Sequence, residues 1–328
     1  MSAEAVRPWI VIAGPTASGK TELSLQLAEE FSGEVLCTDS MQVYRGLDIG
    51  TAKPTPEEQR RVPHHLLDRV EPDEAYSAGR YVREAWEVIE QLRQRARLPL
   101  LVGGTGLYYR ALTQGLSDIP EVPEDVRASV LAEQQEHGTP ACWKRLQQID
   151  PRGAASLHPN DTSRVTRALE VFQSTGRSIL DYQSEQPFAS QQRPLWIGGF
   201  DFPRAELYER INQRVLAMLD QGWVDEVEHL RQHHSPDIPG FRAIGYGEIR
   251  QHLEGQLSRA DMIARIQQRT RQYAKRQLTW FRREPHFRWH APGAWAEIRE
   301  EIQQALEAGS RSATQPPQRS SSAAGVGD

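Results

Sequence analysis

The sequence has little of what several classes of protein require. Among its 328 residues are only two cysteines, Cys37 and Cys142, too few for a disulfide framework or a cysteine-based zinc site. No apolar run reaches the ~18 residues of a membrane helix, and we find no basic-then-apolar leader. We therefore expect neither a membrane span nor a secretory signal. The shortage of cysteine favours the reducing cytoplasm.

Excess positive charge is also lacking. The formal net charge is −5, which argues against a protein that coats nucleic acid non-specifically. A nucleic-acid site needs only a local basic face, however, and the segment 265–283 supplies one. Seven of its residues are basic and none is acidic: Arg265, Arg269, Arg271, Lys275, Arg276, Arg282 and Arg283.

The same segment contains three aromatic residues, Tyr273, Trp280 and Phe281. In a helix, several of the basic residues share one side with Tyr273 because they are spaced four and three apart. Such a helix is either a solvated surface with aromatic residues packed inward, or a phosphate-contacting surface with stacking groups for single-stranded nucleic acid. We favour the second interpretation. The segment 163–167 is a weaker basic patch.

What the sequence does contain is a phosphate-binding motif near its start. Residues 14–21 fit the pattern G-x-x-x-x-G-K-[ST]. The apolar run 9–13 predicts a buried strand before the motif, and 22–31 predicts an amphipathic helix after it. The motif thus has the strand, turn and helix start that it requires, and it predicts a site for a di- or triphosphate.

We assign eight residues to this phosphate site: Gly14, Pro15, Thr16, Ala17, Ser18, Gly19, Lys20 and Thr21. The glycines let backbone N–H groups approach phosphate oxygens, and the helix N-terminus favours negative charge. Lys20 adds a point charge. The Thr21 hydroxyl is placed to reach a Mg²⁺ that bridges the phosphates.

The order of the remaining segments predicts the fold. Strand-like runs at 34–37, 100–102 and 195–200 alternate with helices such as 77–97, while the proline-rich segment 41–72 is irregular. This alternation is typical of an α/β fold with a parallel sheet and crossover helices.

Between 121 and 194 the pattern changes to helices alone. Helix-like segments lie at 124–137, 141–148 and 161–174. We therefore expect a P-loop NTPase-like core at 8–120 and 195–308, with an all-helical subdomain inserted at 121–194. The tail at 309–328 is rich in Ser, Gln, Ala and Pro and is predicted to be disordered.

Asp39 follows the strand-like run 34–37, at the edge where open α/β sheets bind ligands. It is the only carboxylate that the sequence places near the predicted phosphate site. Two roles remain open for it: a metal ligand, as in a kinase, or a general base beside the phosphates.

His64 and His65 are adjacent, and their side chains would point opposite ways on an extended segment. We therefore favour a structural or substrate-lining role over metal binding. Arg210 and Arg214 face the substrate side of the helix expected after Asp201, and the pattern does not distinguish which of them touches a phosphate.

Six segments, taken in order, resemble the tRNA dimethylallyltransferases, also called tRNA isopentenyltransferases. They are GPTASGKT at 14–21, DSMQVYRGLDIGTAKP at 39–54, VPHHLLD at 62–68, GGTGLYYRAL at 103–112, HPNDTSRVTRALEV at 158–171 and KRQLTWFR at 275–282. The resemblance covers about residues 8 to 290. Gly247 departs from it, because many relatives carry Lys or Arg there. The zinc finger of eukaryotic relatives is absent, which indicates the bacterial type.

The resemblance implies transfer of a dimethylallyl group from dimethylallyl pyrophosphate to N6 of the adenosine at tRNA position 37, beside the anticodon, in tRNAs that read codons beginning with U. The products would be N6-(dimethylallyl)adenosine and pyrophosphate. It implies the tRNA anticodon stem-loop as partner, Mg²⁺ as cofactor, and a cytoplasmic monomer with no membrane partner. From the residues alone, a small-molecule P-loop kinase remains the alternative.

The resemblance also assigns roles to residues. Asp39 becomes the general base, and Lys20 and Thr105 complete the catalytic group. Thr21 would hold Mg²⁺ through the pyrophosphate. The residues expected at the tRNA are Asp39, Ser40, Met41, Gln42, Thr105, Arg127, Ser163, Arg164, Val165, Thr166, Arg167, Arg242, Tyr246, Lys275, Arg276, Gln277, Trp280 and Arg282.

Overall fold

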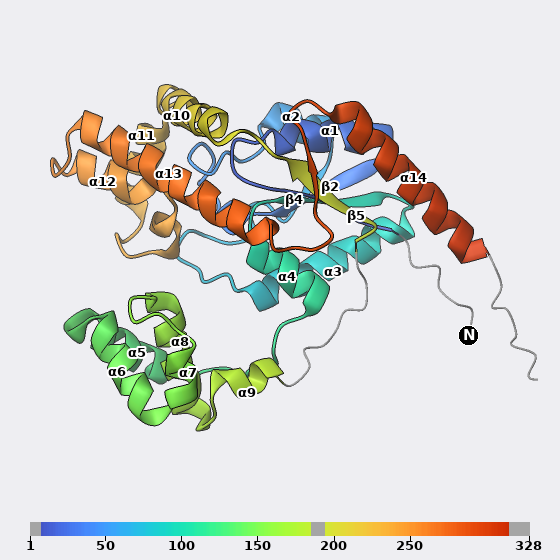
Figure 1. Cartoon of the computed structure of the whole chain (residues 1–328). Helices are drawn as coiled ribbons and strands as arrows, with labels where there is room; N and C mark the ends of the chain where they lie inside the picture. Colours follow the sequence, from blue (N-terminus) through green and yellow to red (C-terminus); the bar gives the residue numbers. More distant parts are fainter. Residues whose placement is uncertain (1–7, 185–193, 315–328) are drawn as a thin grey trace, which may run out of the picture. The chain divides into compact units, whose positions relative to one another are not determined.

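The structure is a computed structural model that describes residues 8–184 and 194–314 (Figure 1). Within these residues one parallel sheet has the order β3-β2-β4-β1-β5-β6. Its strands are β1 Ile10–Ala13, β2 Gly33–Thr38, β3 His64–His65, β4 Leu98–Gly103, β5 Trp196–Phe200 and β6 Arg288–His290. The predicted α/β fold with a parallel sheet is confirmed.

Helices connect the strands and continue beyond them. They are α1 Lys20–Glu30, α2 Pro56–Arg61, α3 Ala78–Gln94, α4 Gly106–Gln114, α5 Glu124–His137, α6 Thr139–Ile149, α7 Pro151–Ala155, α8 Thr162–Thr175, α9 Ile179–Ser184, α10 Arg204–Asp220, α11 Trp223–His233, the 3₁₀ helix η1 Pro239–Arg242, α12 Tyr246–Leu253, α13 Arg259–Phe281 and α14 Trp295–Thr314. The short helices α2, α7 and α9 were not predicted, because segments of five or six residues show too little periodicity.

Apolar side chains cover both faces of the sheet. Leu23 and Leu27 of α1 pack with Ile298 and Ile302 of α14 against the strands. Helix α3 contacts β2 and β4 and lies across the sheet from α1 (Figure 1). Strands β1, β2 and β5 are fully buried because parallel sheets are covered on both sides, whereas the edge strands β3 and β6 are partly exposed.

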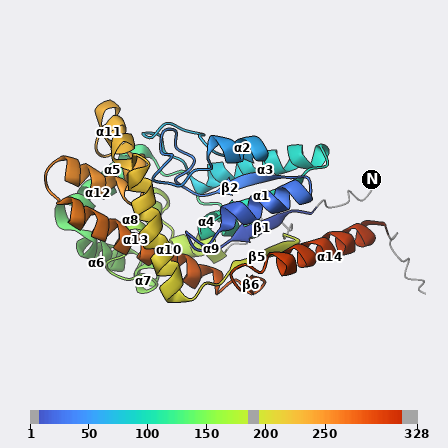
Figure 2. The same ribbon diagram turned by 90° about the horizontal axis from the view of Figure 1, so that it is seen from above.

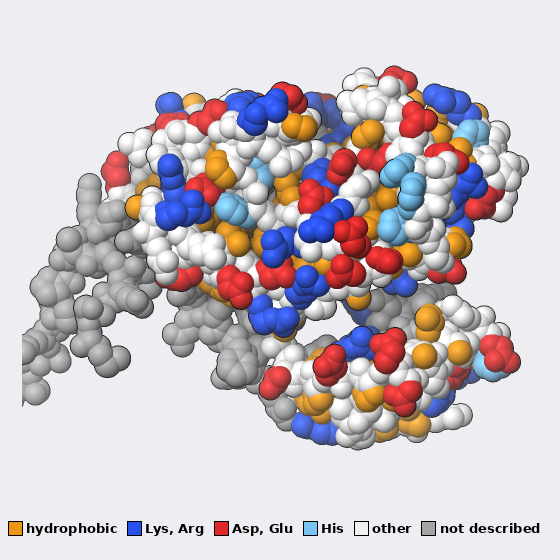
Figure 3. Space-filling view, turned by 180° about the vertical axis from the view of Figure 1, so that it is seen from behind, with side chains coloured by type: hydrophobic (Ala, Val, Ile, Leu, Met, Phe, Trp, Pro, Cys, Tyr) orange, Lys and Arg blue, Asp and Glu red, His pale blue; other side chains and the backbone are white. Residues whose placement is uncertain are grey.

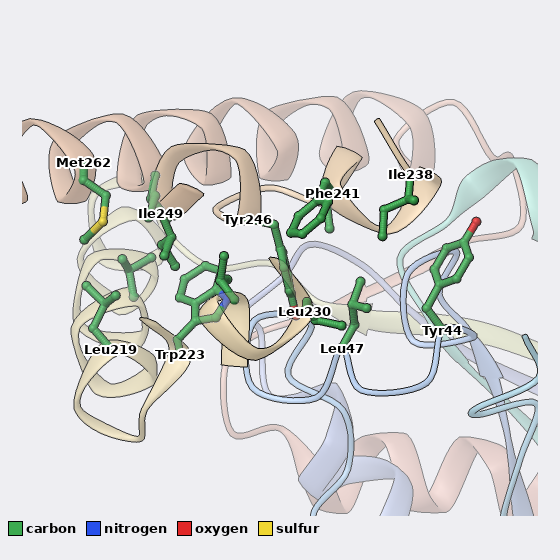
Figure 4. Close-up of a cluster of buried hydrophobic side chains, with 14 of the residues drawn as sticks. Tyr44, Leu47, Leu219, Trp223, Leu230, Ile238, Phe241, Tyr246, Ile249 and Met262 are labelled. Atoms are coloured by element: carbon green, nitrogen blue, oxygen red, sulfur yellow. The ribbon is translucent and has the colours of Figure 1, made fainter. Parts of the chain in front are cut away.

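A second apolar cluster joins the loop after β2 to helices from the C-terminal half of the chain (Figure 4). Tyr44 and Leu47 of the loop pack with Trp223 of α11 and Tyr246 of α12, all of them buried. Helices α10, α11, α12 and α13 gather at one end of the sheet (Figures 1 and 2). The irregular segment predicted at 41–72 is therefore held by tertiary packing.

The described residues divide into two compact units. The first holds the sheet, and the second begins at Arg110 and includes α5 to α9. A small core of its own stabilises the second unit, with Val130, Cys142 and Leu146 fully buried. The boundary between the two units lies at Arg110, inside α4, and not at the predicted 121. Helix α4 runs unbroken across this boundary, so no change of secondary structure marks it.

The C-terminal helix is longer than expected. The prediction of a disordered tail from 309 is wrong for 309–314, because α14 runs to Thr314. The rest of that predicted tail, 315–328, lies outside the described residues.

Surface charge is mixed in sign. Acidic and basic side chains are interspersed on the face shown in Figure 3, and many form exposed ion pairs such as Arg60 with Glu57 at 2.6 Å. Exposed pairs of this kind contribute little to stability. Within the described residues, no helix has both the length and the apolar character that crossing a membrane requires.

Candidate active site

The phosphate loop lies at the carboxyl edge of the sheet. Strand β1, between β4 and β5, leads into the loop, and α1 begins at Lys20. Gly19 caps α1 with a φ of 83°, a left-handed conformation that favours glycine. The Lys20 ammonium donates to the carbonyl of Pro15 at 2.6 Å, so the charge lies over the loop where a phosphate would sit.

Asp39 is at the same edge, directly after β2. Its Oδ1 accepts the backbone N–H of Met41 at 2.8 Å. Burial raises the pKa of Asp39 above its usual value, and this effect is opposed by the N–H of Met41 and the charge of Lys20. Asp39 therefore holds a proton more strongly than an exposed aspartate, which suits a general base.

One cavity of about 910 Å³ contains both features. Among its lining residues are Lys20, Asp39, Gln42, Arg214, Tyr273 and Arg276. Of the eight predicted phosphate-site residues, 16–21 line this cavity, whereas Gly14 and Pro15 do not. All lining residues belong to the first unit.

The structure distinguishes the two arginines of α10. Arg210 donates its Nε to the carbonyl of Ala17 at 2.9 Å and thus supports the phosphate loop. Arg214 lines the cavity and has no hydrogen-bond or ion-pair partner within the described part of the chain. Burial lowers its pKa, which the charge of Asp39 opposes. Of the two arginines of α10, Arg214 is therefore the one whose guanidinium is available to a bound phosphate.

Lys20 and Arg214 repel each other across the cavity. Burial, then the charge of Arg214, lowers the pKa of Lys20 from 10.5 to about 7, although Asp39 raises it. Two half-buried cations that repel each other place the free protein under electrostatic strain, which Asp39 offsets only in part. A bound anion would relieve this strain, as expected of a pyrophosphate site.

A side chain of helix α13 bridges the phosphate loop and the loop that follows β4. The side chain of Gln277 accepts the N–H of Thr16 at 2.9 Å and donates to the carbonyl of Gly104 at 3.0 Å. A Cβ at Gly104 would lie 1.9 Å from the Gln277 amide nitrogen, and one at Gly106 would lie 2.3 Å from the Trp280 ring. The glycines after β4 are therefore required for the close approach of α13.

This arrangement gives the side chain of one residue expected at the tRNA, Gln277, two partners within the protein. Gln277 is only 5% exposed and faces the phosphate loop, so its side chain cannot reach tRNA without leaving both partners. Trp280 is half-buried, with its ring edge-on to Tyr109 at 5.6 Å and to Phe281. Sequence pattern placed both residues on a basic helix but could not show which side of the helix is covered.

Thr105 supports the cavity wall through two hydrogen bonds to the chain on either side of Asp39. Its hydroxyl accepts the N–H of Ser40 at 3.2 Å, and its own N–H donates to the carbonyl of Thr38. Thr105 is not among the residues that line the cavity. It holds the chain next to Asp39, and direct participation in the reaction stays a prediction.

Ser40, Met41 and Gln42 line the cavity, and their contact with the tRNA stays a prediction. The Gln42 amide is already engaged, because its nitrogen donates to the carbonyls of Thr51 and Ala52, each at 3.0 Å. Its oxygen accepts the Cys37 thiol at 3.1 Å. The orientation of this amide is therefore fixed by the loop that follows.

Two further residues that were expected at the tRNA have buried side chains, so any contact with tRNA would have to be made by their backbone. Val165 is 0% exposed and packs in the core of the second unit. Tyr246 is also 0% exposed, and its hydroxyl donates to Glu226 at 2.6 Å. Both lie on the inward face of a helix, which a motif match between sequences does not reveal.

The other predicted tRNA residues lie at the surface of their units. In the second unit these are Arg127, Ser163, Arg164, Thr166 and Arg167. In the first they are Arg242, Lys275, Arg276 and Arg282. Several basic ones have acidic neighbours, such as Arg282 with Asp201 at 3.2 Å and Arg164 with Asp161 at 3.5 Å. Such exposed pairs are weak enough to exchange for phosphate.

The two histidines have separate environments. His65 is hydrogen-bonded to the buried carboxylate of Glu34 at 2.7 Å. His64 lines the cavity, and burial lowers its pKa. Among the residues that the structure describes, no group of three or more His, Cys, Asp or Glu could hold a metal ion.

Sequence analysis missed Lys53. It is buried, with its ammonium paired to both Asp48 and Asp68 and bonded to the carbonyl of Tyr44. All three charged residues occur in the segments that carry the family resemblance, 39–54 and 62–68. Their position in these segments was the one indication in the sequence that they matter. That Lys53 pairs with Asp48 and Asp68 is visible only in the structure.

Comparison with known proteins identifies the family of this chain. A family profile described as "IPP transferase" covers residues 42–284, most of the chain. The chain belongs to the IPP transferase family. It is 50% identical over 279 residues to the tRNA dimethylallyltransferase of Halorhodospira halophila, and 47% identical over 281 residues to that of Geobacter sulfurreducens. These matches cover 84% and 85% of this chain and 90% of each relative.

Solved structures of the IPP transferase family agree in fold. The tRNA isopentenylpyrophosphate transferase of Bacillus halodurans is 38% identical, with a TM-score of 0.69 over 93% of this chain and 98% of that one. A eukaryotic dimethylallyltransferase acting on tRNA is 29% identical, with a TM-score of 0.76 over 96% of this chain and 81% of that one. The resemblance inferred from the six sequence segments is confirmed.

Proposed function

We propose that this protein transfers the dimethylallyl group of dimethylallyl pyrophosphate to N6 of the adenosine at tRNA position 37. The observation that carries the proposal is one cavity lined by a carboxylate with a raised pKa, Asp39, and by two half-buried cations, Lys20 and Arg214. The relatives are named as tRNA dimethylallyltransferases. The alternative of a small-molecule kinase is wrong for this family.

The proposed reaction is a substitution at the allylic carbon. The N6 nitrogen forms a bond to that carbon, the carbon–oxygen bond breaks, and its electron pair leaves with pyrophosphate. The proton released from N6 passes to the Asp39 carboxylate. An adenine amine is a poor nucleophile because its lone pair is delocalised into the ring, so a placed base can contribute about 10²–10⁴-fold.

Negative charge grows on the pyrophosphate as the bond breaks. Lys20, Arg214 and the N–H groups of the loop and of the α1 N-terminus would stabilise that charge. The cavity must also shield the electron-poor allyl group from water. Because the target base is stacked in the anticodon loop, the enzyme must extrude it, which costs a few kcal/mol.

Mg²⁺ fits this site only as a companion of the pyrophosphate. Thr21 lines the cavity, and the described residues offer no cluster of metal ligands. Mg²⁺ is commonly held by one or two protein groups together with substrate phosphates. Thr21 would supply the protein ligand, and the ion would neutralise charge on the leaving group.

We also propose a cytoplasmic monomer. Both cysteines are free and buried, as in many proteins of a reducing compartment. For tRNA we propose the exposed side of α13, around Lys275 and Arg276, together with the surface residues named above in the second unit.

Charge reversal at Arg276 tests the proposed RNA surface. Arg276 is exposed and borders the cavity, with its guanidinium 5.7 Å from the centre of the Tyr273 ring. We expect Arg276→Glu to weaken tRNA binding and to reduce the slope of log K against log salt concentration by about one. Fluorescence anisotropy of a labelled anticodon stem-loop at several salt concentrations measures both quantities.

Arg259→Glu is the matched control for this measurement. Arg259 is exposed at the other end of the same helix, about 25 Å away at the helical rise per residue. Its reversal should leave the salt slope unchanged. Equal slopes for wild type and Arg276→Glu would contradict an RNA contact at that residue.

Incubation with radiolabelled dimethylallyl pyrophosphate, Mg²⁺ and unmodified tRNA tests the proposed function itself. Nucleoside analysis should find the label on the adenosine beside the anticodon. A tRNA with another base at that position is the control and should stay unlabelled. Label on a different nucleoside, or none on any tRNA, would overturn the proposal.

A further inference from the structure

Glu226 is the most heavily hydrogen-bonded carboxylate beside the cavity, and the proposed reaction does not use it. Its Oε2 accepts the N–H groups of Asp48 at 3.0 Å and Ile49 at 2.6 Å. Its Oε1 accepts the N–H of Gly50 at 3.2 Å and the hydroxyl of Tyr246 at 2.6 Å. Three consecutive backbone N–H groups thus form an anion-binding concavity, and a side chain from far along the chain fills it.

Packing presses the same loop against α11 and α12. A Cβ at Gly50 would lie 2.0 Å from the indole nitrogen of Trp223 and 2.6 Å from the Tyr246 ring. Both aromatic side chains are buried in the cluster of Figure 4. The loop can therefore approach only because residue 50 is glycine, and Glu226 determines how its N–H groups are aimed.

The loop held by Glu226 forms part of the cavity wall. Gly50, Thr51 and Ala52 line the cavity, whereas Glu226 does not. The carbonyls of Thr51 and Ala52 accept the amide of Gln42, which lies three residues after Asp39. Glu226 thus binds the first three residues of the loop 48–52, and the last two residues bind Gln42. Through the loop, Glu226 is linked to the part of the cavity wall beside Asp39.

We propose that Glu226 is a positioning residue that fixes the loop 48–52 and, through Gln42, the place of the target adenine beside Asp39. This inference rests on the proposed function for the identity of the adenine. A carboxylate is required because four donors converge on it, and a shorter apolar side chain would leave them unsatisfied.

The test compares Glu226→Ala with Glu228→Ala. Glu228 is the control because it lies on the same helix and, among the described residues, its carboxylate binds only side chains of that helix, Arg231 at 2.9 Å and Gln232 at 3.1 Å. Loss of the Glu226 carboxylate should lower kcat/KM for tRNA by about 10- to 100-fold, as expected for misplacement by about an ångström. The KM for dimethylallyl pyrophosphate should stay within about twofold, because the phosphate loop is not touched. Glu228→Ala should match wild type.

Added formate distinguishes a missing carboxylate from general damage. Formate can enter the space left in Glu226→Ala and accept the same N–H groups, so it should restore part of the lost activity. It should not change wild type or Glu228→Ala. Equal activity of Glu226→Ala and Glu228→Ala, or a loss that formate does not reverse in a folded variant, would overturn the proposal.

Amide hydrogen exchange gives a readout that does not depend on the reaction. The amides of residues 48–50 should be protected in wild type, exchange faster in Glu226→Ala and slow again with formate. If wild type labels no tRNA, the proposed function fails while this exchange still tests the loop contact. If Glu226→Ala does not fold, Tyr246→Phe is the second variant, because it removes one of the four donors to Glu226. It should lower kcat/KM for tRNA by less than the roughly 10- to 100-fold expected for Glu226→Ala. Unchanged kinetics together with unchanged exchange would count against the proposal.

Discussion

Replacing Asp39 by alanine is expected to reduce dimethylallyl transfer by about 10²–10⁴-fold, the contribution of a placed general base. The carboxylate lines the cavity with Lys20, and its removal takes away the group that is proposed to accept the N6 proton. Binding of the anticodon stem-loop should change little, because Asp39 contributes one contact among many. Single-turnover rates and anisotropy measure the two effects separately.

Asp39→Asn is the control that keeps the shape of the side chain. It should be as slow as the alanine variant, because an amide cannot accept the proton. If either variant loses tRNA binding instead of turnover, Asp39 positions the RNA and another group is the base.

The pH dependence follows from the raised pKa of Asp39, for which burial is the main cause. The base works only when deprotonated, so the rate should fall as pH decreases, and should do so at a higher pH than for an ordinary aspartate. The acidic limb of the profile should disappear in Asp39→Asn. An identical acidic limb in both proteins would assign it to another group.

Replacing Lys20 by alanine is expected to lower turnover by about 10²–10³-fold, comparable to removing one donor from a site of developing charge. Lys20 is the cation at the centre of the phosphate loop. The effect should appear in the chemical step and in the affinity for inorganic pyrophosphate, whereas affinity for tRNA alone should be nearly unchanged. Normal turnover of a folded Lys20→Ala protein would remove Lys20 from the mechanism.

Lys20 should also make pyrophosphate binding depend on pH. Its pKa is about 7 in the free protein, owing first to burial and then to Arg214, and a bound anion raises it. Above pH 7, pyrophosphate binding is therefore accompanied by uptake of a proton by Lys20, and the affinity for pyrophosphate should fall as pH rises. At pH 8 about one-tenth of Lys20 is charged in the free protein, which weakens binding by up to about tenfold.

Calorimetry in buffers of different ionisation enthalpy measures this proton uptake. Lys20→Arg is the control, because a guanidinium stays charged throughout this range. Proton uptake by Lys20→Arg measures the protons that pyrophosphate itself exchanges on binding. The additional uptake in wild type is then due to Lys20. Equal proton uptake in both proteins would contradict the lowered pKa.

The sequence by itself determined the parts of this protein that depend on neighbouring residues. The phosphate motif at 14–21 is contiguous, so its loop and the start of α1 could be predicted from residue type and periodicity. Asp39 could be placed because the carboxyl ends of parallel strands share one edge. The family could be inferred because its motifs are contiguous segments in a set order.

Only the tertiary structure decided which side chains meet across the chain. Gln277 reaches Thr16 over 261 positions, and Glu226 reaches Ile49 over 177. It also separated Arg214, which lines the cavity, from Arg210, which binds the phosphate loop, and it showed that the side chains of Val165 and Tyr246 are buried. The physical reason is that burial and hydrogen bonding depend on how distant segments pack, whereas residue order in one sequence specifies only local periodicity.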